Sequence, residues 1–109
     1  MAEAKRYEMT NKANPFLRGD DLQFKLRYER PEGDSKRIVA ARNAPIITCP
    51  KNGVIQTTNE TAQRMIENYH APTNTKRNGV ARPPGAMFED VTATTAPEDV
   101  DVDLDTILI

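Results

Sequence analysis

The C-terminal residues 100–109 constrain the fold more than any other segment, because they alternate aspartate with aliphatic residues and then end on Thr-Ile-Leu-Ile. A period of two residues is typical of a β-strand with one apolar and one charged face. This segment follows residues 72–97, which are rich in Pro, Thr, Asn and Ala and show no periodicity. We therefore predict a terminal strand that adds to a sheet edge on a partner, and a body that stays folded when the strand is deleted.

The size of the chain limits it to one small domain. It has 109 residues, of which 38% are hydrophobic, with three Tyr, three Phe and no Trp. Domains shorter than roughly 70–80 residues rarely gain more than a few kcal/mol from a single core. Cys49 is the sole cysteine, and the sequence has neither a secretory leader nor an apolar run of membrane-spanning length. We expect an intracellular protein that gains stability from its partners.

Charge is divided sharply along the chain. Residues 1–88 contain all fifteen Lys and Arg together with nine acids, a net charge of +6, whereas residues 89–109 contain seven acids and no base. Blocks of opposite charge attract each other, either within one chain or between copies. The alternative, that both blocks are simply solvated, stays open.

Four short strands are predicted, at residues 22–29, 36–42, 46–49 and 54–56. In the first, Leu22, Phe24, Leu26 and Tyr28 alternate with polar residues, which gives one apolar face. Turn-forming residues at 31–35 predict a hairpin between the first two strands. Asn52-Gly53 predicts a second hairpin between the last two, because both residues tolerate the positive φ of a type I′ turn.

One amphipathic helix is predicted after the strands. Thr57 and Glu60 fit a capping box, so the helix should begin at Thr57 and end near His70, before Pro72. Its apolar stripe comprises Ala62, Met65, Ile66 and Tyr69. The fold class is therefore α+β, a small antiparallel sheet of about four strands followed by one helix and flanked by extended arms. The N-terminal arm, the body, the extended linker and the terminal strand are predicted at 1–21, 22–70, 71–99 and 100–109.

Apolar residues in the arms are the candidate contacts with partners, because the surrounding segments are too polar to bury them alone. These candidates are Phe16, Leu17, Met87, Phe88, Val100, Val102, Leu104, Ile107, Leu108 and Ile109. In this interpretation the aliphatic residues of the terminal strand fill pockets on a partner's sheet while its acids meet a basic surface.

A basic face is predicted around the first hairpin, formed by Arg27, Arg30, Lys36, Arg37 and Arg42. Basic side chains near aromatic ones, here Phe24 and Tyr28, are typical of single-stranded nucleic-acid binders. The acidic, apolar-ended tail is also similar to the C-terminal tails of single-stranded DNA-binding proteins. This alternative function stays open, although the alternation favours core packing of the two aromatic residues.

The sequence offers no catalytic or cofactor set. His70 and Cys49 occur once each on separate predicted elements, and a nucleophile needs an adjacent base and an orienting group. Asp101, Asp103 and Asp105 have the spacing of the start of a calcium loop, but the required glycine and the final glutamate are missing. We predict no enzyme activity, no metal site and no cofactor.

Residues 46–69 combine a short strand, the run Gly53-Val54-Ile55-Gln56-Thr57, and Glu60-Thr61-Ala62 at the start of an amphipathic helix. This combination resembles small accessory proteins encoded among the head and tail genes of tailed bacteriophages. The resemblance implies a structural protein of the virion, either a capsid decoration or cement protein or a component of the head–tail neck, assembled in the host cytoplasm. Its partners would be capsid or other virion protein subunits, with many copies or a homo-oligomer and no membrane.

Overall fold

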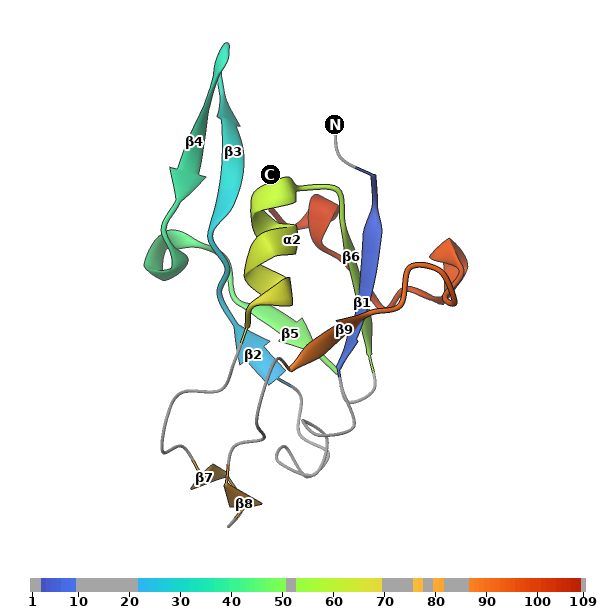
Figure 1. Ribbon diagram of the computed structural model, residues 1–109. Coiled ribbons are helices and arrows are strands. Elements are labelled where there is room, and N and C mark those ends of the chain that lie inside the picture. The colour runs from blue at the N-terminus through green and yellow to red at the C-terminus, as the bar shows by residue number, and fades with distance from the viewer. Residues whose placement is uncertain are drawn as a thin grey trace.

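The protein is an α+β fold built on a mixed four-stranded sheet, seen in a computed structural model that describes residues 3–9, 22–50, 53–69, 76–77, 80–81 and 87–108. The strand order is β10-β6-β1-β9 (Figure 1). The strands are β1 (Lys5–Met9), β6 (Val54–Thr57), β9 (Phe88–Asp90) and β10 (Val102–Asp103). The helix α2 (Glu60–Glu67) packs against β6 and β9. The predicted fold class, with a single α-helix in the described part of the chain, is confirmed.

Three two-stranded pairs accompany this sheet. They are β2 (Leu22–Phe24) with β5 (Ile47–Cys49), β3 (Tyr28–Glu32) with β4 (Ser35–Val39), and β7 (Lys76–Arg77) with β8 (Val80–Ala81). The first two pairs follow one another as a two-stranded ribbon, which is broken by residues 25–27 on one strand and by the 3₁₀ turn η1 (Ala41–Asn43) on the other. The predicted hairpin between the first two strands is confirmed.

The β3–β4 turn has the geometry that its sequence predicts. Glu32 pairs with Ser35, which leaves a tight turn at Gly33 and Asp34. Gly33 has a φ of 63°, a left-handed conformation that other residues adopt only with strain. The alternation before it is also confirmed, because Phe24, Leu26 and Tyr28 are buried.

The second predicted hairpin is wrong. β5 pairs with β2, whereas β6 pairs with β1 and β10, so the two strands flanking Asn52-Gly53 belong to different sheets. Gly53 does not have a positive φ, and its N–H donates to the Pro50 carbonyl at 2.7 Å. A Cβ at this position would lie 2.7 Å from that carbonyl oxygen. Glycine is required for this close approach. The Asn-Gly pair in the sequence does not distinguish such an approach from a type I′ turn.

The helix begins two residues later than its capping box predicts. Thr57 is the last residue of β6 and is fully buried, whereas Asn59 is the N-cap and accepts from the Ala62 N–H at 3.0 Å. Asn is as good an N-cap as Thr, so the shift of position costs little. The helix ends at Glu67 rather than near His70, which lies outside the described residues. Its predicted apolar stripe faces the core through Ala62, Met65, Ile66 and Tyr69.

The predicted N-terminal arm needs correction at β1, which lies in the middle of the sheet between β6 and β9. Tyr7 and Met9 are 1% and 2% exposed and form its buried face. Two apolar residues are too few to give a clear period in the sequence, and the strand exists because β6 and β9 supply partners on both edges.

The core joins segments from both ends of the chain. Phe24, Tyr69 and Phe88 form a cluster with ring centroids 5.2–6.1 Å apart, from three segments distant in sequence. Leu104 is fully buried in the same hydrophobic core. The predicted body at 22–70 therefore lacks three of the four strands of the sheet, and its core is completed by residues predicted to lie in arms and linker.

Candidate interaction site

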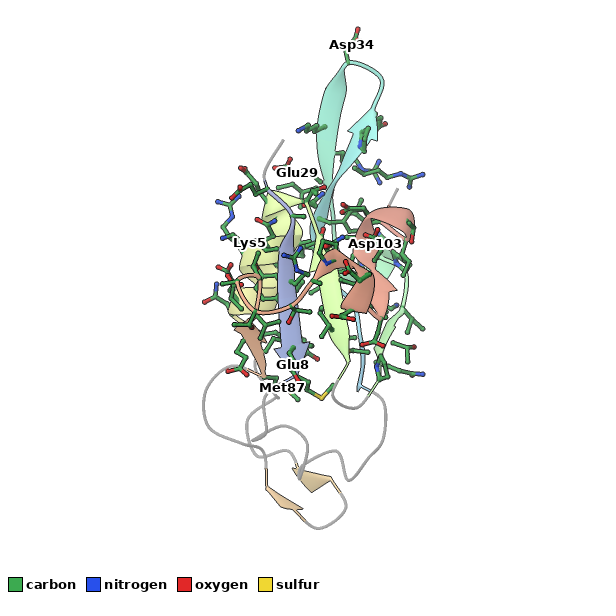
Figure 2. The ribbon with its side chains drawn as sticks, turned by 90° about the vertical axis from the view of Figure 1, so that its right-hand side faces the viewer. Lys5, Glu8, Glu29, Asp34, Met87 and Asp103 are labelled. Atoms are coloured by element: carbon green, nitrogen blue, oxygen red, sulfur yellow. The ribbon has the colours of Figure 1, made fainter. Side chains whose placement is uncertain are left out.

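The β3–β4 hairpin extends away from the rest of the molecule. Figures 1 and 2 show its two strands leaving the body beside α2, with Asp34 at the tip in Figure 2. Its base is fixed by the buried pair Tyr28 and Val39, 4% and 3% exposed, and by the Asn59 side-chain amide, which donates to the Glu29 carbonyl at 2.9 Å. Beyond this base every hairpin residue from Arg30 to Ile38 is exposed. The hairpin therefore presents two faces to solvent.

The two faces of the hairpin differ in charge. Arg30 lies directly opposite Arg37, and both follow the Tyr28–Val39 pair on one face. The other face carries Glu29 opposite Ile38, then Pro31 opposite Lys36. Lys36 Nζ lies 3.7 Å from Glu29 Oε2, and Arg37 Nη1 lies 3.7 Å from Glu32 Oε2. Directly opposed like charges destabilise a strand pair, so the placement of Arg30 opposite Arg37 does not stabilise the hairpin.

Two large apolar side chains are exposed on or beside this ribbon. Ile38 on β4 is 54% exposed and Ile46, just before β5, is 61% exposed. Single exposed apolar residues are common on protein surfaces. Here they accompany a projecting pair of strands that contributes little to the core, a combination that suits contact with another surface.

The predicted basic face lies on the surface, and the predicted aromatic residues do not. All five predicted cations, Arg27, Arg30, Lys36, Arg37 and Arg42, are exposed. Phe24 and Tyr28 are 5% and 4% exposed and pack in the core. Stacking on nucleobases needs an open aromatic ring, so these two residues cannot supply it in the folded protein.

The acidic tail binds its own body, which corrects the predicted addition to a partner. Val102 and Asp103 pair in parallel with Ile55 and Gln56 of β6. Asp101 accepts from the Val54 N–H at 2.9 Å. After this short strand, Leu104–Thr106 form the 3₁₀ turn η3, so the strand predicted at 100–109 is only two residues long.

Asp105 is the most heavily bonded acid of the tail. Its carboxylate accepts from the Thr57 hydroxyl at 2.9 Å, the Thr58 N–H at 3.0 Å and the Thr58 hydroxyl at 2.8 Å. Asp103 accepts from the Asp105 N–H at 3.1 Å and thereby caps η3. These acids satisfy polar groups at the junction of β6 and α2 and are not directed at a basic partner.

Most of the described apolar candidates for partner contacts are buried in the chain's own core. Leu104, Leu108, Met87 and Phe88 are 0–4% exposed, and Val102 is partly buried against the core. This corrects their predicted role, because core packing leaves them inaccessible. Val100 is half-buried and Ile107 is 37% exposed. Phe16, Leu17 and Ile109 lie outside the described residues.

Arg6 on β1 holds the connection between β9 and β10 against the sheet. Its guanidinium donates to the Thr95 carbonyl at 2.6 Å, the Thr92 carbonyl at 2.9 Å and Gln56 Oε1 at 3.1 Å. The 3₁₀ turn η2 (Pro97–Asp99) follows, with Glu98 and Asp99 both exposed. The sequence gives little sign of this role of Arg6, which is a lone charged residue on the polar side of a short alternation.

Burial and hydrogen bonding shift the pKa of three groups. Burial, and then the hydrogen bond from the Tyr7 hydroxyl to Glu67 at 2.7 Å, raise the pKa of Tyr7 well above its usual value. Burial also raises the pKa of Tyr69. Hydrogen bonds from the Thr92 hydroxyl and N–H lower the pKa of Asp90. Tyr7, Tyr69 and Asp90 all lie in or beside the four-stranded sheet, away from the hairpin.

Within the described ranges, no group of three or more His, Cys, Asp or Glu residues has a metal-binding arrangement. Cys49 is buried at the end of β5, and its thiol faces the Gly53 carbonyl at 3.8 Å. None of the helices in the described part of the chain is long and apolar enough to cross a membrane.

No family model matches the chain, and neither do any curated proteins or solved structures.

Proposed function

We propose that this chain is a non-enzymatic structural protein of a viral particle, which docks on neighbouring subunits through its β3–β4 hairpin. The observation that carries the proposal is the exposure of the whole hairpin beyond Tyr28 and Val39, with five cations and Ile38 around it. An isolated two-stranded hairpin is marginally stable in water, so a projecting one is best explained by contacts outside the chain. The viral assignment rests on the sequence resemblance of residues 46–69.

The docking element differs from the one the sequence favours. Residues 101–108 are held by β6 and by the core, so they do not serve as a free strand in the folded protein. The hairpin carries three cations and three acids together with the exposed Ile38, and it fits a mixed surface of a protein subunit. A capsid decoration or cement protein and a neck component are both compatible with such an arm.

Binding to single-stranded nucleic acid is the second candidate, favoured by the exposure of all five cations. Against it, Phe24 and Tyr28 are buried, and Glu29, Glu32 and Asp34 lie among the cations of the hairpin. Acids at these positions repel phosphates. Fluorescence anisotropy with a labelled oligonucleotide at low salt tests this candidate directly, because tight binding that is lost in Arg30→Ala with Arg37→Ala would favour it over protein docking.

The main test uses a variant that removes the arm and keeps the body. Replacing residues 30–37 with Asn-Gly joins Glu29 to Ile38, an existing cross-strand pair, through a two-residue turn. We expect this variant to keep a wild-type thermal melt, since none of the deleted side chains is in the core. In particles produced by complementing a gene deletion, immunoblotting should show its loss from the virion.

The matched control is Thr48→Ala, an exposed change on β5 outside the hairpin, which should be incorporated like the wild type. Wild-type incorporation of the hairpin-deleted variant would overturn the proposal.

A further inference from the structure

We infer that the hairpin's Arg30–Arg37 pair binds the acidic η2 turn of a second copy of this chain, through Glu98 and Asp99. This inference rests on the docking role proposed for the hairpin and names its partner. The contact joins two different surfaces, so copies associate head to tail into a ring or an open chain.

The hairpin side of the contact is an unbalanced cationic pair. Arg30 and Arg37 are directly opposite each other on one face, and both are exposed. Arg37 has Glu32 at 3.7 Å, whereas Arg30 has no ion pair within the described residues. A guanidinium binds a carboxylate through two parallel hydrogen bonds, so two neighbouring guanidinium groups match two neighbouring carboxylates. Binding of acids would also relieve the repulsion between the opposed arginines.

The acidic side is a turn held in a fixed position. Glu98 and Asp99 are exposed on η2, and neither carboxylate has a hydrogen bond or ion pair with any residue that the structure describes. By contrast, Asp90, Asp101 and Asp105 use their carboxylates within the chain. Arg6 fixes the segment that leads to η2 through the Thr92 and Thr95 carbonyls. A preorganised surface loses less entropy on binding.

The two surfaces cannot meet within one copy. Figure 1 shows the hairpin and the connection between β9 and β10 on opposite sides of the molecule, with α2 and the sheet between them. Pairing of strand edges does not explain the contact either, because Pro31, Lys36 and Arg37 place proline and charge on the hairpin strands, features that discourage edge pairing. The contact is therefore made by side chains, between copies.

Its strength follows from the exposure of its charges. Exposed ion pairs gain little because water and salt screen them, so a single contact is weak and depends strongly on salt. In a closed ring, or on a particle that holds many copies, each contact forms at a raised effective concentration, which supplies the missing affinity. We expect association of the purified chain at low ionic strength, with an association constant that falls by at least about tenfold as salt rises from about 0.02 M to about 0.5 M.

The test exchanges the charges of the two surfaces. One variant carries Arg30→Glu with Arg37→Glu, and the other carries Glu98→Lys with Asp99→Lys. Sedimentation velocity should show each variant alone to be monomeric. An equal mixture should associate like the wild type, because each acidic surface then meets a basic one on the other variant. Arg64→Glu, an exposed change on α2, is the matched control and should associate normally.

Circular dichroism melts check that both variants are folded. If the hairpin variant does not fold, the η2 variant still tests the contact on its own. A monomeric mixture, a monomeric wild type at low salt, or association of either variant alone would overturn the inference. If that happens while deletion of the hairpin still excludes the protein from particles, the docking role of the hairpin stands and only its partner is misidentified.

Discussion

The C-terminal tail and the β3–β4 hairpin are both predicted as strand segments, and they have opposite structural roles. The sequence predicts partner contacts for the apolar residues of the tail and a basic face around the hairpin. The tail is taken into the sheet by β6, with Leu104 and Leu108 buried and Asp105 bonded to Thr57 and Thr58. The hairpin keeps one buried pair at its base and exposes the rest.

The difference shows that alternation predicts a strand without telling which sheet it joins. An acidic side chain accepts a hydrogen bond from a backbone N–H as readily as it pairs with a basic side chain. Asp101 and Asp105 of the tail accept from backbone N–H groups in this way. On the hairpin, Arg37 has an exposed ion pair with Glu32 at 3.7 Å, and Arg30 has none within the described residues. Variants that change one region and spare the other test this contrast.

Deleting residues 101–109 should give the largest effect and unfold the protein. The deletion removes Leu104 and Leu108 from the core, and a buried leucine truncated to alanine alone costs about 2–5 kcal/mol. The total is comparable with the whole stability of a small domain, about 5–15 kcal/mol. Far-UV circular dichroism should show loss of the cooperative melt.

This outcome is the reverse of the sequence expectation that the body survives without its terminal strand. The hairpin-deleted variant provides the comparison and should melt like the wild type. A cooperative melt of the tail-deleted protein would mean that the tail is dispensable for the fold.

Leu104→Ala should destabilise the protein by about 2–5 kcal/mol, because it leaves a cavity at a fully buried position. Ile107→Ala, three residues along the same tail and 37% exposed, is the control and should cost less than about 1 kcal/mol. Urea denaturation at neutral pH measures both. Equal effects would show that packing of the tail is less specific than its burial indicates.

Asp105→Ala should cost about 1–3 kcal/mol, since it leaves the Thr57 hydroxyl and the Thr58 N–H without their acceptor. Asp105→Asn keeps one carbonyl acceptor and should recover part of the loss. Asp99→Ala removes an exposed acid from η2 and should stay within about 0.5 kcal/mol of the wild type. If Asp99→Ala were the more damaging of the two alanine variants in the same urea titrations, the assignment of roles to the acids would be reversed.

Tyr7→Phe, a change in the sheet, should alter how the stability of the protein depends on pH, whereas a change in the hairpin should not. The pKa of Tyr7 is raised in the folded state, so its contribution is fully present below the unfolded pKa of about 10 and is lost as pH rises above it. At neutral pH the variant should lose about 1 kcal/mol through the missing hydrogen bond to Glu67.

Above about pH 10 the stability advantage of the wild type over Tyr7→Phe should shrink, by at most about 1.4 kcal/mol per pH unit. Parallel urea titrations at neutral and alkaline pH measure this difference. Arg30→Ala, which leaves the sheet unchanged, should keep the wild-type slope with pH. A constant difference between wild type and Tyr7→Phe across the range would contradict the raised pKa.

Much of the local structure was predictable, because short-range signals decide it. The alternation Phe24, Leu26, Tyr28 and the turn at Gly33 gave the hairpin correctly, and the stripe including Ala62 and Ile66 gave the helix. The sheet was not predictable from such signals. Its strands β1, β6, β9 and β10 come from distant segments, and β9 and β10 are only three and two residues long.

For the same reason, the exposed cations of the candidate site were predictable and the burial of the expected contact residues was not. The five exposed cations follow from their polar positions on a predicted hairpin. Burial of the predicted contact residues Met87, Phe88, Leu104 and Leu108 could not be foreseen, because it depends on β9 pairing with β1 and on the tail returning to β6. The restraining role of Arg6 depends on carbonyl groups about ninety residues away in sequence.

Arg30→Ala should have the smallest effect on stability and completes the contrast with the tail. Arg30 is exposed, makes no ion pair in the described structure, and lies opposite another arginine. Removing one of two directly opposed like charges relieves repulsion, so the free energy of unfolding should change by no more than about 0.5 kcal/mol and in the stabilising direction. Differential scanning calorimetry at low salt measures this, with the difference diminishing as salt screens the pair. A loss of more than about 1 kcal/mol would mean that Arg30 supports the fold, and the hairpin would then belong with the tail as a structural element.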